Sequence, residues 1–258
     1  YNFLKPLLGD KDKYVFQPDW WNVGIDTFID VCFFVSGAFM VAGIASHKAY
    51  LWIFPVALLL VLLYFARSWY ITKICQQTAE YPFQFRLSQW QFRIDPANQQ
   101  AVLAIQATQF TGVHVLMIGP KGSGKTSLAV AMANERSIDR QKCVYATASK
   151  WLTQLHDADD DLLKGNPYAL ATWRKADWLV VDDLHPGDPV LGDFITPAIV
   201  QQHLQSRPEN IHALVSRNVI WVLGSDAPGT HHQLRNWQQW LQQIGVQEAH
   251  MRILDLSA

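Results

Sequence analysis

A glycine-rich segment at residues 119–126 has the residue types and spacing of a phosphate-binding loop. It reads Gly-Pro-Lys-Gly-Ser-Gly-Lys-Thr and matches the pattern G-x-x-x-x-G-K-[ST] at every fixed position. Glycines let a backbone turn its N–H groups inward around a phosphate, and the N-terminus of a following helix adds positive potential. We therefore expect this loop to bind ATP through Gly119, Pro120, Lys121, Gly122, Ser123, Gly124, Lys125, Thr126 and Ser127.

Two of these residues have more specific expected roles, and a second segment complements them. Lys125 would contact the outer phosphates, and the Thr126 hydroxyl would bind Mg²⁺. Further along the chain, the apolar run Trp-Leu-Val-Val at 178–181 leads into Asp182 and Asp183. A carboxylate at the end of a buried strand can hold the magnesium that the loop threonine also contacts. We predict this metal role for Asp182, and we predict that Asp183 orients or deprotonates the attacking water.

Other polar residues are weaker candidates for the same chemistry. Ser225 follows the next expected strand and could lie between the acidic pair and the γ-phosphate, although such loops often carry Ser as a helix cap. Arg235 is our first choice for an arginine supplied to a neighbouring subunit's nucleotide, ahead of Arg207 and Arg217. An ordinary surface position is the alternative for each arginine. The adjacent pair His231-His232 does not predict a metal site, because neighbouring residues do not share a helix face.

The elements that would position these residues alternate between strand and helix. Apolar runs predict strands at 114–118, 143–147, 178–182, 219–223 and 251–256, with helices between them. We also expect a short strand at 92–94, a helix from 96 to about 110, a helix from 197 to about 206 and a helix at 233–243. Such alternation predicts an α/β fold: the three-layer αβα core of a P-loop NTPase, with a five-stranded parallel sheet covered on both faces.

The N-terminal quarter of the chain is more apolar than the rest. In the whole chain of 258 residues 50% are hydrophobic and only 17% are charged, against about 25% charged in an ordinary soluble domain, and this shift comes from the N-terminal quarter. Apolar runs at 23–45 and 50–66 are each close to the length that crosses the hydrocarbon core of a bilayer as a helix. They predict a transmembrane hairpin at residues 23–66. A buried or interfacial helix is the alternative for the first run, where Asp26 and Asp30 would lie at headgroup depth or mark a functional site.

Charges around the hairpin predict its orientation. Lysines precede it and basic residues follow it, whereas the turn between the runs carries only Lys48. The positive-inside rule places both ends, and the C-terminal domain, in the cytoplasm, with the hairpin in the inner membrane. Three cysteines without a C-x-x-C spacing indicate reduced thiols. The expected organisation is an N-terminal segment (1–22), the hairpin (23–66), a linker (67–90) and a P-loop ATPase domain (91–258).

Three segments together resemble a known family. Residues 119–126, the run Val-Tyr-Ala-Thr-Ala-Ser-Lys-Trp-Leu at 144–152 and residues 178–184 are similar to the DnaC/IstB-like helicase-loader and transposition-helper branch of the AAA+, or additional-strand, P-loop ATPases. The resemblance covers roughly residues 91–256 and implies an ATPase that acts on a partner. Three features depart from that family: the hairpin, the Asp-Asp pair where many such enzymes have Glu, and a sequence that stops at the last expected strand, so that no helical lid is expected in it.

We therefore expect a membrane-anchored, homo-oligomeric ATPase that remodels or assembles a protein partner, whose identity the sequence does not give. A small-residue ladder at Ala38, Ala42 and Ser46 weakly favours self-association. Asp183 is shorter than Glu by about one C–C bond, roughly 1.5 Å, so slow hydrolysis is expected. A nucleotide-controlled switch or scaffold is therefore one alternative. The family's handling of nucleic acid is another, but from residue 91 onward 14 Lys and Arg face 16 Asp and Glu, which does not support it.

Overall fold

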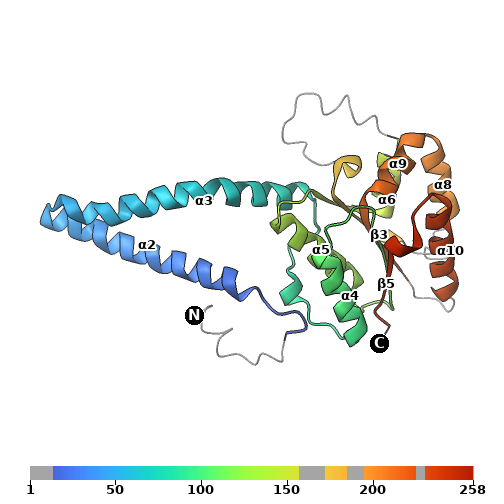
Figure 1. Ribbon diagram of the computed structural model, residues 1–258, viewed down its shortest axis with the longest axis horizontal. Coiled ribbons are helices and arrows are strands. Elements are labelled where there is room, and N and C mark those ends of the chain that lie inside the picture. Colours follow the sequence, from blue (N-terminus) through green and yellow to red (C-terminus); the bar gives the residue numbers. More distant parts are fainter. Residues whose placement is uncertain (1–13, 157–171, 185–194, 225–229, 258) are drawn as a thin grey trace.

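The computed structural model describes residues 14–156, 172–184, 195–224 and 230–257. A helical hairpin projects from an α/β domain in Figure 1. The domain contains a five-stranded sheet of β1 (His114–Ile118), β2 (Cys143–Thr147), β3 (Trp178–Leu184), β4 (Asn218–Leu223) and β5 (Met251–Asp255). Its order is β2-β3-β4-β1-β5, and every neighbouring pair is parallel. The predicted fold class is confirmed, with β4 inserted between β1 and β3.

Helices cover both faces of this sheet. One face packs against α4 (Pro96–Ala107) and α5 (Lys125–Ile138), and the other against α6 (Ala148–Gln154), α8 (Pro197–Gln205), α9 (Pro208–Ser216) and α10 (Thr230–Gln243) (Figure 1). All residues of β1 and β4 are buried. Their apolar runs are therefore explained by a sheet that helices cover on both faces. The second face is rich in tryptophan: Trp221 of β4 packs against Trp151, Trp237 and Trp240.

Local capping explains where several helices begin. The Asp95 carboxylate accepts hydrogen bonds from the backbone N–H groups of Ala97 and Asn98 at the start of α4. The predicted start of α8 is confirmed, because Thr196 caps the helix and Pro197 occupies its first position. The expected strand at 92–94 is wrong: the chain there is irregular and leads into the Asp95 cap, and Phe92 packs against the glycine loop. Helix α9 was not expected from the sequence.

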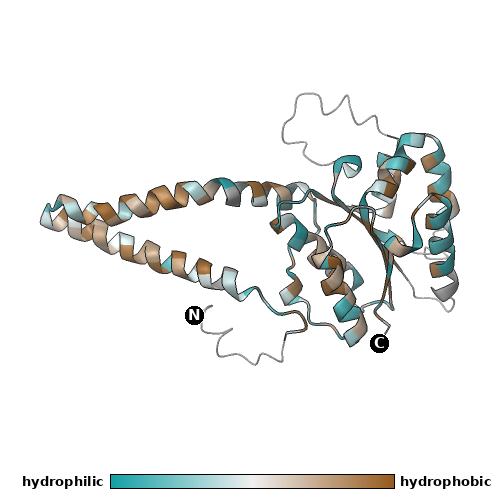
Figure 2. Ribbon diagram, viewed as in Figure 1, coloured by the Kyte–Doolittle hydropathy of each residue, from teal (hydrophilic) through white to brown (hydrophobic). Residues whose placement is uncertain are grey.

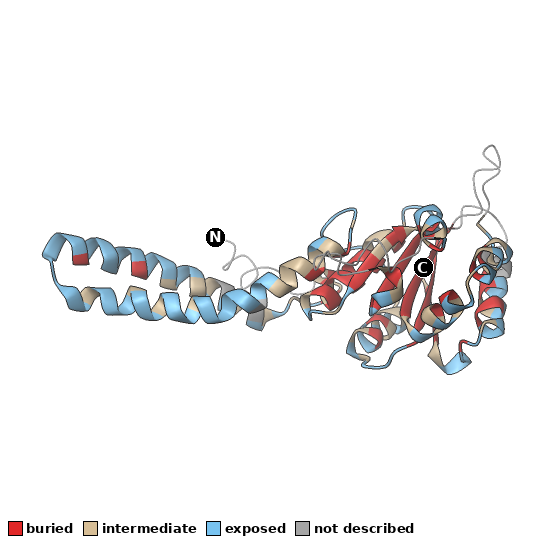
Figure 3. Ribbon diagram, turned by 90° about the horizontal axis from the view of Figure 1, so that it is seen from above, coloured by how far each residue is buried: buried red, intermediate tan, exposed pale blue. Residues whose placement is uncertain are grey.

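The N-terminal hairpin consists of α2 (Trp20–Ser46) and α3 (Ile53–Thr78), joined through a short 3₁₀ turn at Ala49–Trp52. Two segments are long and apolar enough to cross a membrane: Thr27–Ser46, with mean hydropathy 2.1, and Ala49–Thr78, with mean hydropathy 2.3. Their apolar windows are 11% and 0% buried, so neither is a core helix of the described domain. Figure 2 shows the apolar colouring along both helices, and Figure 3 shows that most of their surface is exposed.

Helix α3 does not end where the apolar run ends. Residues 67–78, expected to begin a linker, continue the same helix and reach the α/β domain. There the Gln76 amide donates to Asn134 Oδ1 at 2.9 Å, and the Thr72 hydroxyl donates to the carbonyl of Ile138 at 3.4 Å. The segment after α3 adds a backbone hydrogen bond from Tyr145 N–H to the Ala79 carbonyl at 2.8 Å. The hairpin is thus joined to the domain by a helix that packs on it.

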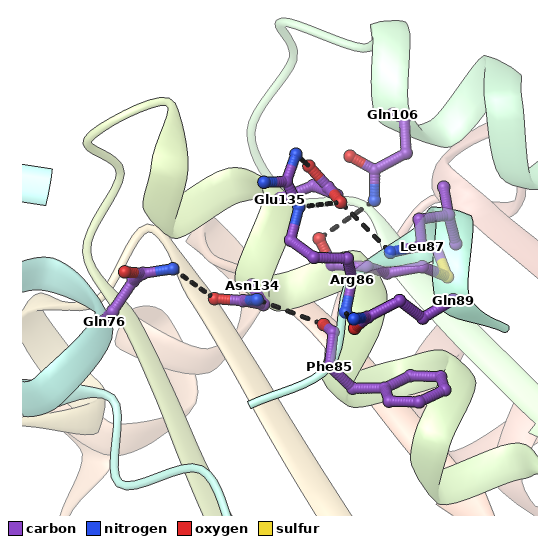
Figure 4. Close-up of polar contacts among 9 residues, drawn as sticks. Gln76, Phe85, Arg86, Leu87, Gln89, Gln106, Asn134 and Glu135 are labelled. Carbon is purple, nitrogen blue, oxygen red and sulfur yellow. Dashed lines mark hydrogen bonds and ion pairs between the residues drawn. The ribbon is translucent and has the colours of Figure 1, made fainter. Parts of the chain in front are cut away.

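The irregular segment at 80–90 binds the same end of α5. Arg86 forms a two-pronged ion pair with Glu135, with Nε–Oε1 and Nη2–Oε2 distances of 2.8 and 3.1 Å, and the Leu87 N–H donates to the same carboxylate at 3.0 Å. Figure 4 shows Gln76, Arg86 and Leu87 gathered around Asn134 and Glu135. The Tyr81 and Ser137 hydroxyls lie 2.8 Å apart. We call this set of contacts between residues 72–87 and residues 134–138 the α3–α5 junction.

Strand β3 is irregular and strained near its carboxyl end. Its pairing with β4 shifts register between Val181 and Leu184, and Asp183 has φ of +58°. A positive φ is costly for a residue with a Cβ atom, although Asp tolerates it better than most. The Asp183 N–H donates to Asp182 Oδ1 at 2.8 Å, which helps to hold this conformation. Asp183 is exposed at this carboxyl end of the strand, between the buried residues Asp182 and Leu184.

This strain can be measured. Asp183→Gly should have a free energy of unfolding about 0.5–1 kcal/mol higher than that of Asp183→Ala, and so unfold at a higher urea concentration, because glycine lacks the Cβ that penalises positive φ while retaining the N–H donor. Urea denaturation followed by circular dichroism in mild detergent would measure the difference. A glycine variant that is less stable than the alanine variant would show that the backbone at residue 183 is not strained.

Candidate functional site

The glycine loop lies between β1 and α5, at the carboxyl end of the sheet. Helix α5 begins at Lys125, so its first turn faces the loop. Gly122 and Gly124 have φ of +81° and +84°, a region that favours glycine. A Cβ added to Gly124 would lie 2.7 Å from the Phe92 ring, so this position also lacks room for a side chain. The conformation of the loop backbone at residues 122 and 124 therefore favours glycine at both positions.

The Lys125 ammonium lies across this loop. It donates to the carbonyls of Gly119 and Pro120 at 2.7 and 2.8 Å, and the side chain is buried. Ser123 N–H closes a turn on the Pro120 carbonyl at 3.2 Å, and the Ser127 hydroxyl donates to Gly124 O at 2.9 Å. Among the described residues the buried Ser123 hydroxyl has no hydrogen-bond partner. A cationic group and a free hydroxyl on one loop suit a phosphate.

Asp182 joins the loop to β3. Its carboxylate is 1% exposed, and its Oδ1 accepts from the Thr126 hydroxyl at 3.2 Å and from the Asp183 N–H at 2.8 Å. Its Oδ2 accepts from the Tyr145 hydroxyl at 2.8 Å. Thr126 and Asp182 are thus brought together as the sequence predicted. A hydroxyl and a carboxylate at one point are the oxygen ligands that Mg²⁺ prefers, so these residues fit that ion.

Tyr145, on the neighbouring strand β2, lies in the segment 144–152 that carries the family resemblance, but the sequence did not assign it a role at the site. Burial, followed by the negative charge of Asp182, raises the pKa of Tyr145 above its ordinary value. The phenol therefore stays protonated at neutral pH and acts as the donor in its bond to Asp182.

The aromatic residues Trp90 and Phe92 were also missed as neighbours of the loop. The Trp90 indole N–H donates to the Gly124 carbonyl at 3.1 Å, and the two rings lie 5.4 Å apart between centroids. Phe16, which precedes the hairpin, packs on Trp90 at 5.9 Å. The only signal in the sequence was the aromatic spacing W-x-F before α4, because these contacts depend on tertiary packing.

The remaining predicted residues are placed less closely. Pro120 and Lys121 are exposed on the outer side of the loop. Arg235 is exposed on α10, on the face of the sheet opposite α5, and its role toward a neighbouring subunit stays a prediction. Ser225 lies outside the described residues. Of the predicted acidic pair, Asp182 contacts the loop threonine through its side chain, whereas Asp183 contacts Asp182 through its backbone.

Comparison with solved structures finds distant similarities. The crystal structure of the DnaC helicase loader is 16% identical, with 64% of this chain and 93% of that chain covered and a TM-score of 0.38. That of DnaI is 14% identical, with 70% and 93% covered and a TM-score of 0.39. AMPPCP-bound DnaA from Aquifex aeolicus is 15% identical, with 68% and 51% covered and a TM-score of 0.38. Because these TM-scores are below 0.5, we assign the fold from the strand order alone.

A family model gives the stronger result. The model described as IstB-like ATP binding protein matches residues 58–188, just over half of the chain. The match begins inside α3 and includes the α3–α5 junction, the glycine loop and the acidic end of β3. It therefore covers both groups of residues that meet at Thr126 and Asp182. The chain belongs to the family of IstB-like ATP-binding proteins.

Proposed function

We propose that this protein is an ATPase anchored in the inner membrane by its N-terminal hairpin, and that it uses ATP to remodel or assemble a protein partner at the cytoplasmic face. The observation that carries the ATPase assignment is the contact between Thr126 and Asp182, because it joins the phosphate loop to a buried carboxylate. Membership of an ATP-binding family supports it.

The chain's own residues have distinct roles in this proposal. Loop N–H groups and the Lys125 ammonium would bind the phosphates, and Thr126 and Asp182 would hold Mg²⁺, which neutralises phosphate charge when bound. Asp183 is exposed beside this point and would orient the attacking water. Its short side chain, on a strained backbone, agrees with slow hydrolysis.

The attachment of the hairpin supports its proposed orientation. Phe16 before α2 and Trp90 after α3 pack on each other and are both buried in the domain. The two ends of the hairpin therefore return to the same domain, as a hairpin that enters and leaves a membrane on one side requires. The basic residues that flank the hairpin favour the cytoplasmic side.

Assembly and partner are the least specific parts of the proposal. A homo-oligomer would bring an exposed arginine, Arg235 first among them, to a neighbouring nucleotide. Nucleic acid is a weaker partner than protein, because the domain has a slight acidic excess.

The nucleotide site is tested by Lys125→Ala. Loss of the ammonium should abolish ATP binding, measured by equilibrium titration of the detergent-solubilised chain with a fluorescent ATP analogue. Lys142→Ala, an exposed lysine just before β2 at the opposite, amino end of the sheet, is the matched control and should keep binding within about threefold, a difference below 1 kcal/mol. Full binding and ATPase activity in the Lys125 variant would place the site elsewhere.

The anchor is tested by extraction of membranes with alkaline carbonate. The intact chain should stay in the pellet. Leu60→Arg combined with Leu63→Arg, at exposed positions of α3, should release a large fraction, because each arginine costs about 2.5–3.5 kcal/mol in a bilayer centre. Leu60→Ile with Leu63→Ile is the control. An intact chain that is soluble without detergent would contradict the anchor.

A second candidate function is a nucleotide-controlled switch with little turnover, and the α3–α5 junction favours it. The helix that begins at the phosphate loop is bound at its other end to α3, so a shift of α5 on nucleotide binding would be passed to the hairpin. Turnover on the order of 1 s⁻¹, ordinary for an enzyme, would remove this alternative.

The coupling is tested by hydrogen–deuterium exchange with and without ATP and magnesium. ATP should change exchange in residues 70–90 of the wild-type chain. Glu135→Gln should reduce that change while ATP affinity stays within about threefold, because the substitution weakens the junction and not the loop. Glu80→Gln, which breaks the exposed ion pair with Lys150, is the matched control. An undiminished change in the Glu135 variant would exclude the junction as the route.

A further inference from the structure

The Asp182 carboxylate is held from three directions. Thr126 and the Asp183 N–H both donate to Oδ1, and Tyr145 alone among the described residues donates to Oδ2. In the sheet, Thr147 is paired with Asp182 and Tyr145 with Val180, so the tyrosine side chain reaches along β3 to the carboxylate. The hydroxyl–carboxylate distance of 2.8 Å is that of a good hydrogen bond.

The geometry points to Tyr145 as a positioning residue for magnesium: its hydroxyl fixes Oδ2 of Asp182 so that Oδ1 faces Thr126. This inference rests on the proposed ATPase function. It adds a residue of β2 to a metal site that the motifs place only on the glycine loop and at the end of β3.

Burial makes this hydrogen bond important. Asp182 is 1% exposed, so water cannot replace a lost donor at Oδ2 without a local rearrangement. A carboxylate with one unpaired oxygen would turn toward another donor, and the Oδ1–Thr126 contact would be disturbed. Partners that orient a metal ligand in this way typically change metal affinity by about 10–100-fold when they are mutated.

Tyr145 is itself held firmly. Its backbone N–H donates to the Ala79 carbonyl at 2.8 Å, and its half-buried ring packs against the core that includes α5. The ring therefore presents its hydroxyl from a fixed position.

Tyr145→Phe tests the inference, because it removes the hydroxyl and keeps the ring. Binding of a fluorescent ATP analogue to the intact chain in detergent would be titrated with Mg²⁺. The half-saturating Mg²⁺ concentration should rise at least about tenfold, while nucleotide affinity in EDTA should stay within about twofold, a change below 1 kcal/mol. A purely structural role would weaken binding in both conditions.

Two further variants make the result decisive. Tyr81→Phe loses a hydroxyl contact of equal length, to Ser137 near the other end of α5, and should keep the wild-type Mg²⁺ dependence. Tyr145→4-aminophenylalanine restores a donor on the same ring and should recover most of the Mg²⁺ affinity. Wild-type protein that binds no nucleotide would overturn the proposed function itself. Wild-type Mg²⁺ dependence in Tyr145→Phe, or equal losses with and without Mg²⁺, would overturn the role of Tyr145.

Discussion

The hydrogen bond between Thr126 and Asp182 links two segments that are 56 residues apart in the sequence. It can form because parallel strands present their carboxyl ends at one edge of a sheet, where the loop after β1 and the tip of β3 both lie. Strand β4 separates β1 from β3, so the contact between Thr126 and Asp182 spans the position of β4 at that edge. A buried carboxylate requires partners, and here the loop hydroxyl, a neighbouring N–H and a tyrosine provide them.

The fold was largely predictable because its signals are local. Each strand is a continuous apolar run, and the strand–helix alternation allows few arrangements other than a parallel sheet. The loop was predictable because Gly122, Gly124 and Lys125 depend on short-range geometry. The expected strand at 92–94 is wrong because Phe92 packs on the glycine loop instead of pairing with a strand. The sequence predicts a linker at residues 67–78 because polar residues interrupt the apolar run there, whereas in the structure α3 continues through them and packs on α5.

The tertiary contacts of the site were not predictable in the same way. Tyr145 reads as one residue of a buried strand, and its partner Asp182 lies on a different strand. The Trp90 indole N–H donates to the backbone carbonyl of Gly124, and a contact with a backbone atom cannot be recognised from the residue type of its partner. The positive φ of Asp183 likewise arises from the register shift at the end of β3 and not from a glycine in the sequence.

The continuity of α3 has a geometric consequence. Its 26 residues rise about 39 Å, which is longer than the roughly 30 Å hydrocarbon layer, so the same rod would emerge from lipid and end against α5. Such a rod transmits angle as well as position. Each residue added within it would turn the end of α3 that packs on α5 by about 100° about the helix axis, whereas an insertion of seven residues would return that end close to its original heading about 10 Å farther along the axis.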